Sequence, residues 1–158
     1  PGYRAWNHRL NLDGHLSYSG KIEDENVGYC QLFRSGIVEG VKTGLVEHAV
    51  ISSSYIEQNI FESVREYLDG MRQLKIACPV FLLVTIAGVK GVNLATSPYR
   101  FEGDPFDRDL LMLPDVMIEN ISDPLDSILR PIFDAIWNAA GHTHCMHYDD
   151  QGRWNIRS

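Results

Sequence analysis

The segment SDPLDSILRPIFDAIWNAAG, residues 122–141, decides the fold class of this chain. Its apolar residues recur at steps of three and four, which is the pattern of one face of an α-helix. They are Leu125, Ile128, Leu129, Ile132, Phe133, Ile136 and Trp137. Ser122 or Asp123 can cap the helix, Pro124 suits its first position, and Gly141 suits a left-handed stop. The segment therefore predicts a helix over 124–140 that lies on a hydrophobic core.

Pro131 conflicts with an uninterrupted helix in this segment. Proline has no amide hydrogen, and its ring crowds the carbonyl four residues earlier. Either the helix kinks at this residue, or the regular helix begins nearer Arg130 after a looser turn.

A second helix is predicted over residues 55–74. Ser54 and Glu57 have the spacing of a capping box, in which each side chain accepts a hydrogen bond from the other residue's amide. The predicted core face consists of Ile56, Ile60, Val64, Tyr67, Leu68 and Met71. Glu57 belongs to the predicted solvent side, which consists of Glu57, Glu62, Arg65, Glu66 and Asp69.

The remaining segments predict strands. Residues 29–34 and 37–41 flank Ser35-Gly36, which is typical of a hairpin. Shorter strands are predicted at 15–18 and 45–51. The run PVFLLVTIA, residues 79–87, is apolar without alternation, which favours a central strand covered on both faces, so we expect Leu83 to be buried.

Residues 110–118 form the last strand candidate, in which Pro114 requires a bulge, an edge position or a break. Together these elements predict an α+β fold. We expect a largely antiparallel sheet of hairpins with two main helices packed on one face.

Length and charge restrict the function classes. The chain has 158 residues, which suits one domain, and a formal net charge of −7. This charge disfavours binding to a phosphate backbone, so we expect no direct nucleic-acid binding by this fragment. We find no apolar run long enough to cross a membrane and no signal peptide, and we expect a cytoplasmic location with reduced cysteines. Because the chain begins with Pro1, we interpret residues 1–158 as a single accessory or interaction domain excised from a longer chain.

His142, His144, Cys145 and His147 are the candidate metal ligands of the sequence. Imidazole and thiolate groups are preferred zinc ligands. In an extended chain, however, His142 and His144 share one face while Cys145 and His147 share the other. With no second ligand cluster elsewhere to complete the site, the sequence predicts no tight zinc site and no other cofactor.

Two further motifs contain residue types that can carry chemistry. The acids around Asp104–Asp109 could hold a divalent ion or act as a base, but nothing in the sequence fixes their spacing. Gly88-Val89-Lys90-Gly91 lacks the spacing of a phosphate-binding loop and is interpreted as a turn. No residue is therefore assigned a catalytic role.

Several stretches of the chain resemble a known family in their residues and in their order along the chain. They are YCQLFRSGIVEGV (29–41), FLLVTIAGVKG (81–91), DRDLLMLPDVMIE (107–119), LRPIFDAIWNAAG (129–141) and YDDQGRW (148–154). In these stretches the chain resembles the C-terminal region of the bacterial Schlafen-like, Alba-type DNA-binding proteins. The nucleic-acid or nucleotide role of that family lies in a separate N-terminal module. The resemblance therefore implies that this portion is an accessory half without catalytic residues.

The functional expectation follows from these points. We expect a non-catalytic sensing or protein-interaction module of a bacterial DNA-binding or defence-type regulator. Its partner would be the rest of the parent chain, another protein or a second copy. Two alternatives stay open: a metal-dependent hydrolase or nuclease-like domain that uses the acids around Asp104–Asp109, and a small-molecule sensor with a pocket between sheet and helices.

Overall fold

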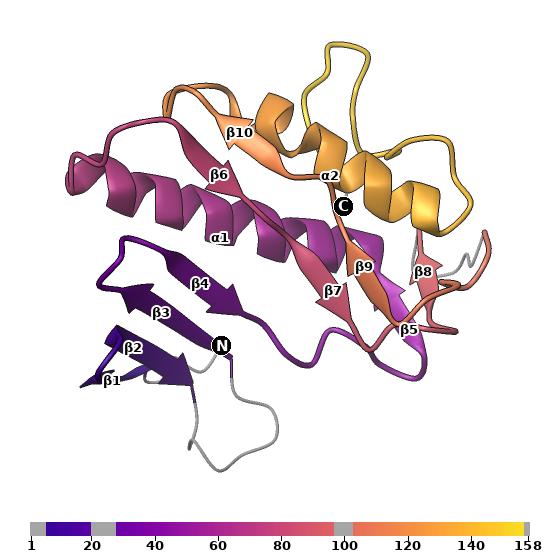
Figure 1. Ribbon diagram of the computed structural model, residues 1–158. Helices are drawn as coiled ribbons and strands as arrows, with labels where there is room; N and C mark the ends of the chain where they lie inside the picture. The colour runs from indigo at the N-terminus through magenta and orange to yellow at the C-terminus, as the bar shows by residue number, and fades with distance from the viewer. Residues whose placement is uncertain (1–5, 20–27, 97–102, 157–158) are drawn as a thin grey trace. The chain divides into compact units, whose positions relative to one another are not determined.

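Residues 6–19, 28–96 and 103–156 are described by the computed structural model. The described residues form mostly antiparallel strands and two helices, so the predicted α+β class is confirmed (Figure 1). The internal contacts divide the chain into a smaller unit, Pro1–Leu45, and a larger unit, Val46–Ser158. Each unit is described by itself below.

The smaller unit is a four-stranded antiparallel sheet in chain order. Its strands are β1 (Trp6–Leu10), β2 (Gly14–Ser19), β3 (Tyr29–Phe33) and β4 (Val38–Val41). The predicted hairpin is confirmed, because β3 pairs with β4 and Gly36 turns between them with φ +90°. Gly14 is needed for a different reason: a Cβ atom there would lie 2.0 Å from the Leu32 carbonyl oxygen.

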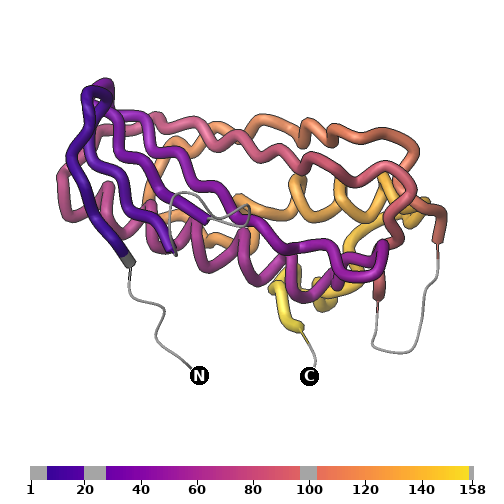
Figure 2. The backbone as a smooth tube through the Cα atoms, turned by 90° about the horizontal axis from the view of Figure 1, so that it is seen from below, coloured from indigo at the N-terminus to yellow at the C-terminus, as the bar shows by residue number. Residues whose placement is uncertain are grey.

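The larger unit holds both helices and the remaining strands. Its elements are β5 (Val50–Ser52), α1 (Ser53–Gln73), β6 (Val80–Leu82), β7 (Thr85–Ala87), β8 (Asn93–Ala95), β9 (Leu110–Met112), β10 (Val116–Ile118) and α2 (Leu125–Ala139). β6 pairs with β10 and β7 pairs with β9, both antiparallel, while β5 and β8 pair in parallel. We call residues 80–87 and 110–118 the ribbon. Both helices lie on the same side of it (Figures 1 and 2).

A bulge interrupts the ribbon at Pro114. Val116 pairs with Leu82 and Met112 pairs with Thr85, so the segment 113–115 lies opposite only 83–84. The extra residue shifts the alternation of exposed side chains by one position in that strand, which is the signature of a β-bulge. The requirement that Pro114 placed on this segment is therefore met by a bulge.

The prediction that residues 79–87 are covered on both faces is wrong. Phe81 is 64% exposed and Leu83 is 67% exposed, whereas Ile86 on the opposite face is buried. The physical reason is that both helices lie on one side of the ribbon (Figure 2). The run of apolar residues thus fills one buried face and one exposed face.

Leu83→Ala should consequently change the free energy of unfolding by less than about 0.5 kcal/mol, as is usual for surface positions. Leu129→Ala, in the core of α2 with no exposed surface, should cost about 2 to 5 kcal/mol. Urea unfolding of both variants would measure the contrast. A loss above 1 kcal/mol, or about twice the surface range, for Leu83→Ala would contradict the exposed position.

The first helix begins differently from the prediction. Ser52 is the N-cap of α1, and its Oγ accepts a hydrogen bond of 3.4 Å from the Tyr55 amide. The predicted capping box of Ser54 and Glu57 is wrong, and so is the solvent position of Glu57, because its side chain is fully buried. Glu57 instead lies on the buried face of α1 with Ile56.

The second helix is confirmed at its core face and at its C-terminal end. Pro124 is the N-cap and no side chain caps it, so the predicted caps Ser122 and Asp123 are wrong. The helix includes Pro131 within its length. Gly141 has φ +84°, and its amide donates to Asn138 O at 3.0 Å while the His142 amide donates to Trp137 O at 3.0 Å. This pair of bonds is the Schellman motif.

Candidate functional site

A fully buried carboxylate, that of Glu57 on α1, is the centre of the candidate site. Its Oε1 accepts a hydrogen bond from Trp137 Nε1 at 2.7 Å, and its Oε2 accepts one from Trp154 Nε1 at 2.6 Å. Oε2 also lies 2.9 Å from His147 Nδ1 and 3.5 Å from the Cys145 Sγ–H donor. A buried carboxylate is tolerated only when its oxygens are hydrogen-bonded in this way.

The Schellman turn at the end of α2 sends the chain back towards Glu57. Beyond it, the Cys145 amide donates to Asp134 Oδ1 on α2 at 2.8 Å, which fixes the returning segment against the helix. The Trp137 and His147 rings meet edge to face with centroids 5.3 Å apart. The end of one helix and the segment after it thus deliver three of the four partners of Glu57.

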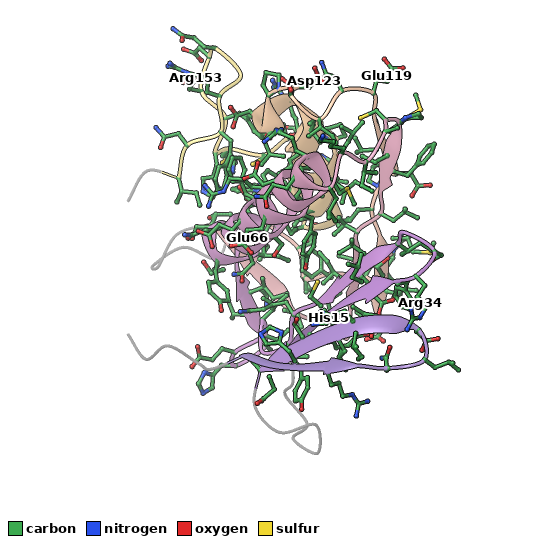
Figure 3. All side chains as sticks on the ribbon, turned by 90° about the vertical axis from the view of Figure 1, so that its left-hand side faces the viewer. His15, Arg34, Glu66, Glu119, Asp123 and Arg153 are labelled. Atoms are coloured by element: carbon green, nitrogen blue, oxygen red, sulfur yellow. The ribbon has the colours of Figure 1, made fainter. Side chains whose placement is uncertain are left out.

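The fourth partner, Trp154, is brought to the site by a turn at residues 149–152. Asp149 Oδ1 accepts hydrogen bonds from the Gln151 and Arg153 amides, both at 2.9 Å, and the Arg153 guanidinium pairs with Oδ2. These contacts lower the pKa of Asp149, with the Arg153 amide as the main cause. Figure 3 labels Arg153 in this loop. The turn lets Tyr148 bridge to Trp154 and brings the Trp154 indole to the buried carboxylate.

Aromatic stacking holds the Trp154 indole in place. It stacks on Phe61 of α1 with ring centroids 4.6 Å apart and is tilted against Phe133 at 5.7 Å. The Trp154 amide bonds Asp126 Oδ1 at 3.3 Å, and Tyr148 Oη donates to the Asp126 carbonyl at 2.8 Å. Trp154 therefore packs within its own unit.

The Cys145 thiol is not an activated nucleophile in this setting. Its side chain is buried, and burial first, then the negative charge of Glu57, raise the pKa of the thiol far above its usual value. A reactive cysteine needs the opposite shift, because the thiolate is the attacking species. Burial likewise raises the pKa of the neighbouring Tyr148.

The structure divides the four metal candidates of the sequence into two pairs. Cys145 and His147 converge on Glu57, and one ligand atom from each of the three residues lies within 4.8 Å of the others. His142 instead packs edge-on against Trp137, with centroids 5.1 Å apart, and His144 Nδ1 is 2.9 Å from Thr143 Oγ1. Glu57, the residue that joins the first pair, was missed by the sequence reasoning.

The acids around Asp104–Asp109 do not converge. Asp107 is exposed and paired with Arg108, whose hydrogen bond lowers the pKa of the carboxyl group. The contacts of Asp104 and Asp109 are made by their backbones: the Asp104 amide donates to the Ala140 backbone carbonyl at 3.0 Å, and the Asp109 backbone carbonyl accepts from the Gly88 amide at 2.8 Å. Within the described ranges, Glu57, Cys145 and His147 form the only group of three or more His, Cys, Asp and Glu side chains close enough to share an ion.

A hollow of about 280 Å³ lies between β9 and α2, where a small-molecule sensor would need its pocket. It is lined by Asp107, Arg108, Leu111, Met112, Leu113, Ala135, Asn138 and Ala139. The volume of this hollow lies just below the usual range for ligand pockets, about 300 to 1,000 Å³. A second hollow of about 280 Å³ borders the Glu57 site and is lined by Met146, His147, Tyr148, Asp149 and Asn155.

The side of the ribbon that faces away from the helices exposes five large apolar side chains. We call it the outer face. It consists of Phe81 (64% exposed), Leu83 (67%), Leu110 (49%), Met112 (78%) and Met117 (52%). Phe81 pairs directly with Met117 across the ribbon, so these side chains form neighbours rather than scattered points.

Comparison with protein families, curated proteins and solved structures gives no match for this chain. The resemblance to the Schlafen-like, Alba-type proteins therefore stays a prediction. In the part of the chain that the structure describes, neither helix is long and apolar enough to span a bilayer.

Proposed function

We propose that the chain is a protein-interaction module and that the outer face of the ribbon is its contact surface. The observation that carries the proposal is the exposure of Phe81, Leu83, Leu110, Met112 and Met117 on one side of two paired strands. Exposing a group of large apolar side chains to water is unfavourable, and contiguous patches of this kind mark interaction sites. The methionines add adaptable, polarizable contacts that suit a binding surface.

The charges around the outer face favour one kind of occupant. Segments 79–90 and 107–119, which contain the ribbon and its flanks, carry four acids and two bases. Arg108, one of those bases, already pairs with Asp107. Glu119, labelled in Figure 3, lies in the connection that leaves β10. The complementary partner is a protein whose contact surface is apolar at its centre and basic at its rim. A second copy would bring like charges together.

The regulatory setting rests on the resemblance described above. In proteins of the Schlafen-like, Alba-type family, a separate module carries the nucleic-acid role. An accessory half with an apolar contact surface and a net charge of −7 is consistent with that division of labour. We propose that this module connects a bacterial regulator to a protein partner.

A designed peptide provides the test, because the natural partner is unidentified. A peptide with alternating Leu and Lys residues should bind the full chain, and its affinity should fall with added salt. It should also bind more tightly than a Leu/Glu peptide of equal length. Leu83→Asp should reduce its affinity severalfold, because burial of a leucine side chain contributes about 1.5 to 3 kcal/mol, whereas the attraction between Lys and one added exposed carboxylate is worth only about 0 to 1 kcal/mol. Fluorescence anisotropy of labelled peptides would measure both effects.

The matched control is Leu12→Asp, which changes an equally apolar side chain that is 91% exposed in the smaller unit. It should leave peptide affinity unchanged. Equal losses in Leu83→Asp and Leu12→Asp, or no preference for the basic peptide, would contradict the proposal. Sedimentation velocity would show whether a second copy of the chain occupies the outer face instead. A dimer of the unmodified chain that becomes a monomer in Leu83→Asp would assign the outer face to a second copy.

A further inference from the structure

We propose that Glu57, Cys145 and His147 bind a divalent transition-metal ion of the zinc class. The donor set carries the proposal: a carboxylate oxygen, a thiolate sulfur and an imidazole nitrogen are the three ligand types that zinc takes in proteins. They come from α1 and from the segment after α2, and their ligand atoms lie within 4.8 Å of one another. This revises the expectation from the sequence, which lacked a ligand outside residues 142–147.

One of the ligand separations around Glu57 matches a tetrahedral ion, and the other is shorter than such an ion requires. With Zn–O and Zn–N bonds of about 2.1 Å and Zn–S of about 2.3 Å, tetrahedral ligands lie roughly 3.4 to 3.6 Å apart. Oε2 of Glu57 is 3.5 Å from Cys145 Sγ and 2.9 Å from His147 Nδ1. An opening of about half an ångström between the imidazole and the carboxylate would accommodate the ion, by the same bond lengths.

The charges also balance. A thiolate and a carboxylate supply two negative charges, a neutral imidazole supplies none, and a divalent ion cancels them. In a buried site this neutrality matters, because an unbalanced charge costs several kcal/mol, on the order of the desolvation penalty of one ion. Binding displaces the proton of the Cys145 thiol, since a coordinating thiol is deprotonated by the metal.

The groups around the ligands are placed as outer partners of a metal site. The Trp137 and Trp154 indoles donate to Oε1 and Oε2 of Glu57 at 2.7 and 2.6 Å, and fix the orientation of the carboxylate. Hydrogen bonds of this kind orient metal ligands and increase metal affinity. His147 is only 15% exposed yet borders the hollow beside the site, which gives an ion and a fourth, water ligand access to it.

The test uses the full chain without an affinity tag, stripped by a chelator and titrated with Co²⁺, which substitutes for zinc and is coloured. We expect saturation at one equivalent and a near-ultraviolet band from thiolate-to-cobalt charge transfer. Cys145→Ser should abolish the band and weaken binding by about tenfold or more. Zn²⁺ should raise the melting temperature of the unmodified chain and have a smaller effect on Cys145→Ser.

Two matched controls separate this site from adventitious binding. Cys78→Ser changes a half-buried thiol elsewhere, and His144→Ala removes the exposed imidazole of the same segment; both should keep the band and the affinity. His147→Gln keeps a donor towards Glu57 but is a poor ligand, so it should fold and lose binding. Absence of stoichiometric binding in the unmodified chain, or an unchanged band in Cys145→Ser, would overturn the proposal. The peptide assay on the outer face is independent of either result.

Discussion

Glu57→Leu should lower the free energy of unfolding by about 3 to 5 kcal/mol, the cost of removing one partner from a buried charged network. Leucine is close in volume to glutamate, so the change removes the acceptors and leaves little cavity. The Trp137 N–H then remains buried, and the N–H groups of Trp154 and His147 remain half-buried, without the oxygens they contact. A buried unsatisfied donor costs about 1 to 3 kcal/mol, so the sum is large even if the interior relaxes.

Urea unfolding followed by circular dichroism would measure this loss. The matched control is Glu66→Leu on the same helix, where the side chain is exposed and is labelled in Figure 3. It should change stability by less than about 0.5 kcal/mol. If Glu57→Leu costs no more than this control, the carboxylate is not a structural centre of the larger unit.

Trp137→Ala should cost about 3 to 5 kcal/mol, because it empties the volume of a large core side chain that is 1% exposed. It also removes the N–H that Oε1 of Glu57 accepts. Trp137→Phe separates the two contributions: it keeps most of the aromatic volume and loses the hydrogen bond, so a smaller cost of about 1 to 3 kcal/mol is expected.

Thermal or urea unfolding of both variants provides the measurement, with Ser127→Ala at an exposed position of α2 as the control. Equal losses for the alanine and phenylalanine variants would mean that the hydrogen bond, rather than the packing, dominates. Because Trp137 and Glu57 are in contact, their effects should not add in a double variant.

The helices could be predicted from the sequence because each presents its apolar residues at helical spacing. The outer face could not, because an apolar run does not reveal whether one face or two will be covered. In residues 79–87 that decision depends on where α1 and α2 lie, which is a tertiary property. The bulge at Pro114 could be anticipated because the restriction is local. Proline has no amide hydrogen to donate to a neighbouring strand, whatever the tertiary arrangement.

The candidate site likewise has residues that the sequence reveals and one that it hides. Cys145 and His147 stand out by residue type, but Glu57 is hidden by the frequency of glutamate on solvated helix faces. A signal was present: Phe61, Val64 and Leu68 follow Glu57 at helical spacing, which places the carboxylate on an apolar stripe. Its partners, however, lie far away in sequence, and no local pattern connects them.

That distance has a kinetic consequence. The hydrogen bonds of Glu57 to Trp137, Cys145, His147 and Trp154 join residues 80, 88, 90 and 97 positions apart. Closing loops of this length costs chain entropy before any contact compensates for it, so such contacts form late during folding. The network therefore acts mainly on unfolding: once formed, it slows the unfolding of the larger unit. The folding rate depends instead on the local helices and hairpins.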